Sequence, residues 1–214
     1  LILFLNFIPI WGTSYELNEK TSEAIILILM SASGFFLMVD AENLIMLFIG
    51  LEIGSISLYA LAGLNRRDKL SNEASLKYFL LGSLASCIFI YGVALVYVSY
   101  SLMSVYDFAL AIAYTGPDLI PLTTFIGVLL IFVGLLFKIA AAPFQSWAPD
   151  VYQGSPTGYV GYMASVAKAA SFIVIARICM VSIRFILEDF EPFFFAVIFS
   201  VSYTHLTLPT SVPV

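Results

Sequence analysis

Successive apolar runs, each long enough to cross a bilayer, constrain this sequence more than any other feature. A helix needs about 20 mostly apolar residues to cross a hydrocarbon core of about 30 Å. Runs of that kind occupy most of the 214 residues, of which 61% are hydrophobic and only 11% are charged. Soluble domains carry about 25% charged residues. The sequence therefore predicts an all-α, polytopic membrane helical bundle.

The polar breaks between the runs divide the chain into spans. Residues 100–119 are too polar and too short to cross, and are expected to lie along the surface as an amphipathic helix. Residues 1–14 lack a basic region and a cleavage site, so they are interpreted as the end of a transmembrane helix that is already under way. The expected full spans are 22–39, 43–63, 74–99, a long run at 120–152, and 156–184, with a further helix starting at 190–200.

Lys and Arg in the short loops predict the orientation. Lys20 precedes the first full span, and Arg66, Arg67 and Lys69 follow the second, so these loops share one side. The loop at 143–157 falls on the same side by count. The positive-inside rule assigns that side to the matrix or cytoplasm, with Arg184 as the exception on the other side.

The run at 120–152 cannot be one straight membrane helix. As a helix it would be about 50 Å long, well over the thickness of the hydrocarbon core. Pro143 lacks an amide hydrogen and its ring clashes with the preceding turn, so the helix should break there and resume through QSWAPDVYQ. Backbone freed at membrane depth must face protein or a water-filled cavity. Lys138, one turn before the proline, is therefore expected to face a hydrated interior.

Other ionisable residues also lie inside the apolar runs. Glu52 and Lys168 lie near the middle of their spans. Each such charge costs roughly 2.5–3.5 kcal/mol on insertion scales, so we expect the charges to meet one another or water. Gly50 and Gly54 flank Glu52 and should allow a partner helix to pack closely. Lys77 lies only a few residues into its span, so snorkelling of its side chain to the interface is the alternative to a functional role.

These residues favour proton transfer without covalent change. Burial favours the neutral form of a lysine, whereas a nearby carboxylate favours the charged form. Moving or neutralising Glu52 would therefore allow Lys138 to release a proton, with Lys168 as the next station through ordered water. A static structural ion pair is the alternative.

The sequence offers few residues that could bind a redox group or a nucleic acid. Cys87 and Cys179 lie in apolar runs without metal-ligand spacing and are expected to be small buried residues. The single histidine, His205, lies in the tail, so we expect no metal and no cofactor bound by this chain. A net charge of −5 argues against a nucleic-acid partner.

Four segments resemble subunit 2 of respiratory complex I, NADH:ubiquinone oxidoreductase, whose bacterial counterpart is the N subunit. The resemblance covers roughly residues 15–195. It rests on LIMLFIGLEIGSISLYALAG, EASLKYFLLGSLAS, GLLFKIAAAPFQSWAPDVYQGSPT and ASVAKAASF.

The resemblance implies an antiporter-like unit of five helices, four to eight, over residues 15–189. It implies that the proton relay consists of Glu52 in helix five, Lys77 in helix six, Lys138 in the discontinuous helix seven, and Lys168 in helix eight. It also implies a multi-pass location in the mitochondrial inner membrane, or the bacterial plasma membrane. NADH, FMN, iron–sulphur clusters and ubiquinone would be bound by other subunits, and the partners would be the lipid bilayer and other membrane-arm subunits, including antiporter-like neighbours.

The sequence departs from that family by what it omits. It is expected to begin in helix three and to stop early in helix nine, so a separate chain would supply the second half or the sequence is incomplete. Residues 201–214, VSYTHLTLPTSVPV, resemble the translation of a sequencing adapter and are expected not to be native. Detection of a peptide containing His205 by mass spectrometry would contradict this.

Two alternatives remain open at the level of sequence. One is a subunit of a multi-subunit sodium/proton antiporter or of a membrane-bound hydrogenase. The other is a scaffold that holds the membrane arm together without pumping protons.

Overall fold

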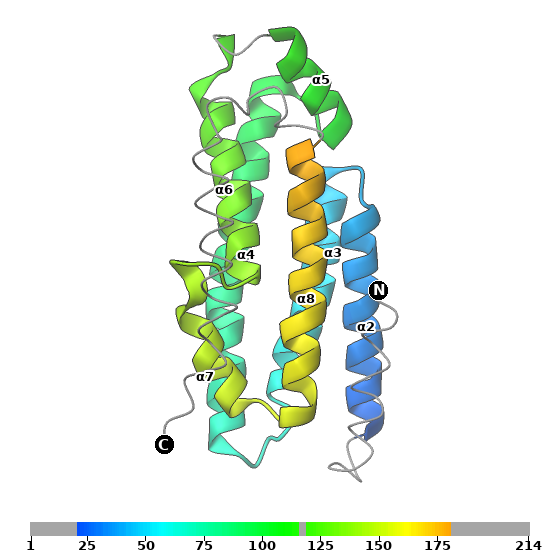
Figure 1. Cartoon of the computed structure of the whole chain (residues 1–214), viewed down its shortest axis with the longest axis vertical. Coiled ribbons are helices and arrows are strands. Elements are labelled where there is room, and N and C mark those ends of the chain that lie inside the picture. The colour runs from blue at the N-terminus through cyan, green and yellow to red at the C-terminus, as the bar shows by residue number, and fades with distance from the viewer. Residues whose placement is uncertain (1–20, 116–118, 181–214) are drawn as a thin grey trace.

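A computed structural model describes residues 21–115 and 119–180, and every regular element in this part of the chain is a helix. The expectations for residues 1–14, 190–200 and 201–214, and for Lys20, Arg184 and His205, lie outside the described residues. Four described helices are long and apolar enough to cross a membrane. The prediction of an all-α membrane bundle is confirmed (Figure 1).

The helix bounds follow the apolar runs closely. Within the segment 100–119, which was expected at the surface, Val105–Thr115 form a short helix at one end of the bundle (Figure 1). The described helices are α2 (Thr21–Asp40), α3 (Leu44–Ala62), α4 (Lys69–Tyr100), α5 (Val105–Thr115), α6 (Leu122–Lys138), the 3₁₀ turn η2 (Phe144–Ser146), α7 (Trp147–Gly154) and α8 (Thr157–Ile178).

Glycines bring α2 and α3 into backbone contact. A Cβ atom on Gly50 would lie 2.5 Å from the amide nitrogen of Met38, and one on Gly34 would lie 2.4 Å from that of Gly54. Only residues without a Cβ permit such an approach. The close packing expected at Gly50 and Gly54 is confirmed, but the partner is α2 rather than a helix that carries one of the lysines.

Two serines of α4 tie its first turns to the end of α3. The Ser71 hydroxyl donates to Ala62 O at 2.7 Å, and the Ser75 hydroxyl donates to Tyr59 O at 2.8 Å. The last carbonyls of a helix have no partner within the helix, so these serines satisfy groups that would otherwise be left unpaired. The contacts align the final turns of α3 with the beginning of α4.

The discontinuous helix is confirmed, but it stops earlier than expected. Lys138 is the last residue of α6, and Ala140 adopts a left-handed backbone with φ of 55°. Pro143 cannot donate to the carbonyl four residues before it, so the helix loses support upstream of the proline itself. α6 consequently ends about halfway along α4 and α8, and α7 continues beyond the break (Figure 1).

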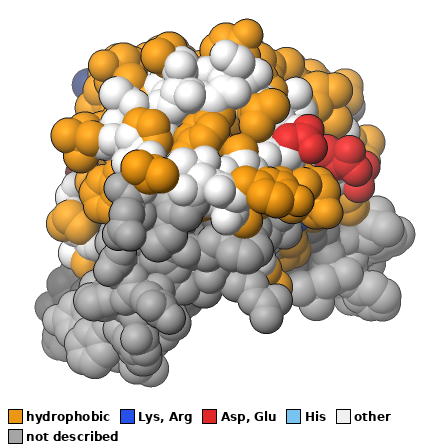
Figure 2. Space-filling view, turned by 90° about the horizontal axis from the view of Figure 1, so that it is seen from above, with side chains coloured by type: hydrophobic (Ala, Val, Ile, Leu, Met, Phe, Trp, Pro, Cys, Tyr) orange, Lys and Arg blue, Asp and Glu red, His pale blue; other side chains and the backbone are white. Residues whose placement is uncertain are grey.

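The fold places the expected loops at two ends. The start of α2, the α3–α4 turn and the α7–α8 turn lie at one end, whereas α5 and the α2–α3 turn lie at the other (Figure 1). Figure 2, which views the α5 end, shows mainly hydrophobic and neutral side chains with a small acidic patch. The prediction that Arg66, Arg67 and Lys69 lie at the same end of the bundle as the turn after α7 is confirmed. The assignment of this end to the matrix or cytoplasm stays a prediction.

Candidate functional site

Lys138 is a buried cation at the point where α6 ends. Its residue surface is only 6% exposed. The ammonium donates to Ser55 Oγ at 3.0 Å and to the hydroxyl of Tyr59 at 2.9 Å, and it lies 5.4 Å from the centre of the Tyr59 ring. Buried charges persist only where polar groups compensate them, so two oxygens of α3 and an aromatic face hold this lysine.

Glu52 lies on the same face of α3 as these two oxygens. Glu52, Ser55 and Tyr59 are spaced i, i+3 and i+7, which places them along one side of a helix. The Glu52 carboxylate accepts a hydrogen bond from the hydroxyl of Ser86 on α4, and its charge interacts with both Lys138 and Tyr59. Glu52 and Lys138, both among the described residues, form no ion pair within 4 Å. The two charges therefore do not meet by direct contact: Ser55 and Tyr59 of α3 hold Lys138, whereas Ser86 of α4 donates to Glu52.

Gly82 of α4 makes room for the Tyr59 hydroxyl. A Cβ atom at position 82 would lie 2.1 Å from that oxygen, so a glycine is required there for the observed geometry. Tyr59 is buried and also packs edge-on against Tyr78 at 4.7 Å between ring centres. The hydroxyl that holds Lys138 is thus fixed by the packing of α3 against α4.

The carbonyls at the helix break find protein partners. Phe137 O accepts from Ala140 N at 3.0 Å and from the indole of Trp147 at 3.1 Å, and Leu136 O accepts from Ala141 N at 3.1 Å. For these two carbonyls the partner is protein, one of the two environments expected for backbone freed at membrane depth. Trp147, the first residue of α7, therefore binds the last turn of α6 directly.

Lys168 is buried separately, in the middle of α8. It is 8% exposed, and no hydrogen bond or ion pair joins it to another described residue. α8 packs against both α6 and α3. The structure brings the helix of Lys168 to the helices of Lys138 and Glu52 without a direct polar contact between the side chains.

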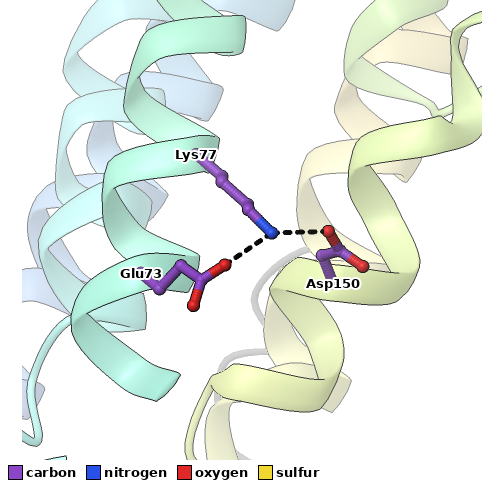
Figure 3. A network of polar contacts seen from close by, with 3 residues as sticks. All are labelled: Glu73, Lys77 and Asp150. Atoms are coloured by element: carbon purple, nitrogen blue, oxygen red, sulfur yellow. Dashed lines mark hydrogen bonds and ion pairs between the residues drawn. The ribbon is translucent and has the colours of Figure 1, made fainter. Parts of the chain in front are cut away.

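Lys77 lies at the surface and has other partners. Its ammonium lies 2.7 Å from a carboxylate oxygen of Glu73 and 2.8 Å from one of Asp150, and its side chain is 42% exposed (Figure 3). The three residues line a pocket of about 180 Å³ between α4 and α7. The structure does not bring Lys77 together with Glu52, Lys138 or Lys168.

Sequence reasoning missed the hydroxyl groups of the site, Ser55, Tyr59 and Ser86, and also Asp150. The i, i+3, i+7 pattern of polar residues on α3 was the available signal. The prediction that both cysteines are buried is wrong, because Cys87 is exposed on α4 and Cys179 is half-buried. Across residues 21–115 and 119–180, no group of three or more His, Cys, Asp or Glu side chains could hold a metal ion.

Comparison with known proteins identifies the family. The family described as "NADH:quinone oxidoreductase/Mrp antiporter, TM" matches residues 41–206. The chain belongs to this family. It is 47% identical over 168 residues to NADH-quinone oxidoreductase subunit N 1 of Chloroherpeton thalassium, with 78% of this chain and 34% of the relative covered. It is 46% identical over 177 residues to the subunit N 1 of Solibacter usitatus, with 82% and 36% covered.

Chains in two solved structures have a fold similar to that of this chain. A chain of respiratory complex I from Thermus thermophilus is 36% identical, with a TM-score of 0.69 over 82% of this chain and 38% of that one. A chain of an archaeal membrane-bound sulfane sulfur reductase is 28% identical, with a TM-score of 0.75 over 84% and 36%. The resemblance to complex I subunits is confirmed, and the chain spans about a third of the length of the curated relatives it matches.

Removing the Tyr59 hydroxyl tests the site with a small change. We expect Tyr59→Phe to lower the coupled turnover of the assembled complex about tenfold, because a hydrogen bond to a charged group contributes roughly 1.5–3 kcal/mol. Tyr91→Phe on the exposed side of α4 is the matched control and should leave turnover unchanged. NADH oxidation with simultaneous recording of proton uptake measures both. Equal turnover in the two variants would show that the hydrogen bond between Lys138 and Tyr59 is not needed for turnover.

Proposed function

We propose that this chain is a proton-translocating subunit in the membrane arm of respiratory complex I. It would move protons while other subunits transfer electrons from NADH to quinone. The observation that carries the proposal is the buried Lys138 ammonium, held at a helix break by Ser55 and Tyr59 on the face of α3 that also carries Glu52.

The relay begins with the charge of Glu52. When that carboxylate is ionised and near, it favours the charged form of Lys138; when it is protonated or displaced, burial favours the neutral form. Lys138 then releases a proton, and the Ser55 and Tyr59 hydroxyls keep the amine in place as acceptors or donors. Lys168 is the next acceptor, reached through water between α6 and α8. Lys77 serves the relay from the α4 surface, as the family resemblance implies.

The assembly around the chain is part of the proposal. FMN, iron–sulphur clusters and ubiquinone would be held by other subunits, and antiporter-like neighbours would flank this one in the membrane. A second chain would supply the remaining helices if the subunit is split. The mitochondrial inner membrane stays a prediction for the compartment, and the curated relatives named above come from bacteria.

A subunit of a different membrane complex is the second candidate. The 28% identity and the TM-score of 0.75 to the sulfane sulfur reductase chain favour it. An Mrp complex chain from Dietzia sp. is 21% identical with a TM-score of 0.65 and supports the shared fold alone.

Copurification separates the two candidates. The chain, extracted from its native membranes in mild detergent, should copurify with subunits that contain flavin and iron–sulphur clusters and with NADH:quinone reductase activity. Mass spectrometry of the partners and the NADH oxidation rate are the measurements. Recovery of the chain in a complex that does not oxidise NADH would overturn the assignment in favour of the antiporter or sulphur-reductase class.

A further inference from the structure

The residues that join α7 to α4 form one stripe. Trp147, Asp150 and Gly154 are spaced i, i+3 and i+7 and share a face of α7. Each meets a residue in the first turns of α4. Trp147 stacks on Tyr78 at 4.7 Å, Asp150 pairs with Lys77 at 2.8 Å, and a Cβ on Gly154 would lie 2.6 Å from that of Ala74.

The ion pair lies between two tight contacts. At one end of the stripe, Gly154 allows the backbones to approach, and at the other the Trp147 ring lies flat on Tyr78 with an interplanar angle of 10°. The Lys77 ammonium reaches between the carboxylates of Glu73 on its own helix and Asp150 on α7 (Figure 3). Asp150 is therefore the charged residue by which this stripe binds α4.

Trp147 connects α7 to the residues around the buried Lys138. Its indole donates to Phe137 O, the carbonyl immediately before Lys138, and its ring stacks on Phe137 at 5.5 Å. Its neighbour Tyr78 packs against Tyr59, which accepts from the Lys138 ammonium. A shift of α7 along α4 would therefore move both the backbone of Lys138 and the tyrosine that holds it.

We propose that the Lys77–Asp150 ion pair fixes the position of α7 along α4 and thereby positions Lys138 against Ser55 and Tyr59. Lys77 and Asp150 are positioning residues in this role. An exposed isolated pair contributes little to stability, so the pair acts by selecting one arrangement of two helices that are already in contact. The part of the proposal that concerns proton output rests on the proposed function, whereas the part that concerns the position of α7 does not.

Two readouts in the assembled complex test the pair. The first is the protons translocated per NADH oxidised. The second is maleimide labelling of a cysteine placed at Ala148, which is fully buried in α7, with the labelled peptide identified by mass spectrometry. The variants are Asp150→Asn, the charge swap Lys77→Asp with Asp150→Lys, and Asp107→Asn as the matched control on an exposed carboxylate of α5.

We expect Asp150→Asn to increase labelling at position 148 at least about threefold and to lower proton output about twofold to fivefold. The swap, which keeps one cation among two carboxylates, should return labelling toward the native value, whereas its proton output should stay low because it also removes Lys77 from the relay. Asp107→Asn should change neither labelling nor proton output. Native labelling in Asp150→Asn, or increased labelling that the swap does not reduce, overturns the proposal. If Asp150→Asn does not assemble, labelling of the swap decides: the native level supports the ion pair, and an increased level overturns it.

Loss of the relay and loss of the positioning role would give different results. Normal proton output in Lys138→Ala would remove the proposed relay but leave the labelling result in force. Reduced output in Lys138→Ala together with native labelling and native output in Asp150→Asn would remove only the positioning role.

Discussion

Replacing Lys138 with alanine should lower coupled turnover of the assembled complex about tenfold or more. The ammonium is the buried charge at the end of α6, and alanine removes the group that could release a proton beside Ser55 and Tyr59. A positioned proton-transfer group typically contributes about 100-fold or more, and tenfold allows for parallel routes in other subunits. The measurements are NADH:quinone turnover and proton translocation in sealed membrane vesicles.

The controls for this variant separate chemistry from assembly. Lys69→Ala removes an exposed lysine at the start of α4 and should leave turnover and proton output unchanged. The flavin and iron–sulphur content of the Lys138→Ala complex should equal that of the native complex, because no redox group is expected in this chain. Normal assembly with an unchanged number of protons per NADH would favour the scaffold alternative.

Neutralising Glu52 should have the second largest effect. Glu52→Gln keeps the size of the side chain and an acceptor for Ser86, but removes the charge that acts on Lys138 and Tyr59. We expect a decrease in coupled turnover of about tenfold, with partial recovery in Glu52→Asp, which restores the carboxylate on a shorter side chain.

The matched control is Glu42→Gln, the same change on an exposed glutamate of the α2–α3 turn. It should leave turnover unchanged under the same assay. A Glu52→Gln complex that pumps at the native rate would remove the carboxylate from the relay, and Lys138 would then have to act without a charged partner on α3.

Much of the fold was predictable because a helix that crosses the lipid bilayer must be long and apolar. The runs at 22–39 and 43–63 correspond to α2 and α3 almost residue for residue. The early end of α6 was not predictable in the same way. Pro143 marks the break in the sequence, but nothing in the sequence around Ala140 signals the left-handed backbone that follows the end of the helix at Lys138.

The charged residues of the candidate site could be predicted from the sequence, whereas its hydroxyl groups could not. A charge in an apolar run is costly, so Glu52, Lys138 and Lys168 stand out from sequence alone. Ser55 and Tyr59 are not costly in a membrane helix, and only the structure reveals that the Lys138 ammonium reaches them. Asp150, the partner of Lys77, is 73 residues away on another helix. Helix periodicity predicts only contacts within one helix, so it could not reveal this pair.

An experimental density map of the assembled complex, at a resolution that reveals ordered water, would show whether Lys138 belongs to a connected proton path. We expect the Lys138 ammonium within hydrogen-bond distance of Ser55 Oγ and the Tyr59 hydroxyl, with ordered water connecting this site to Glu52 and toward Lys168. A Lys138 side chain turned away from both oxygens, or a dry apolar layer between the helices of Lys138 and Lys168, would contradict this expectation.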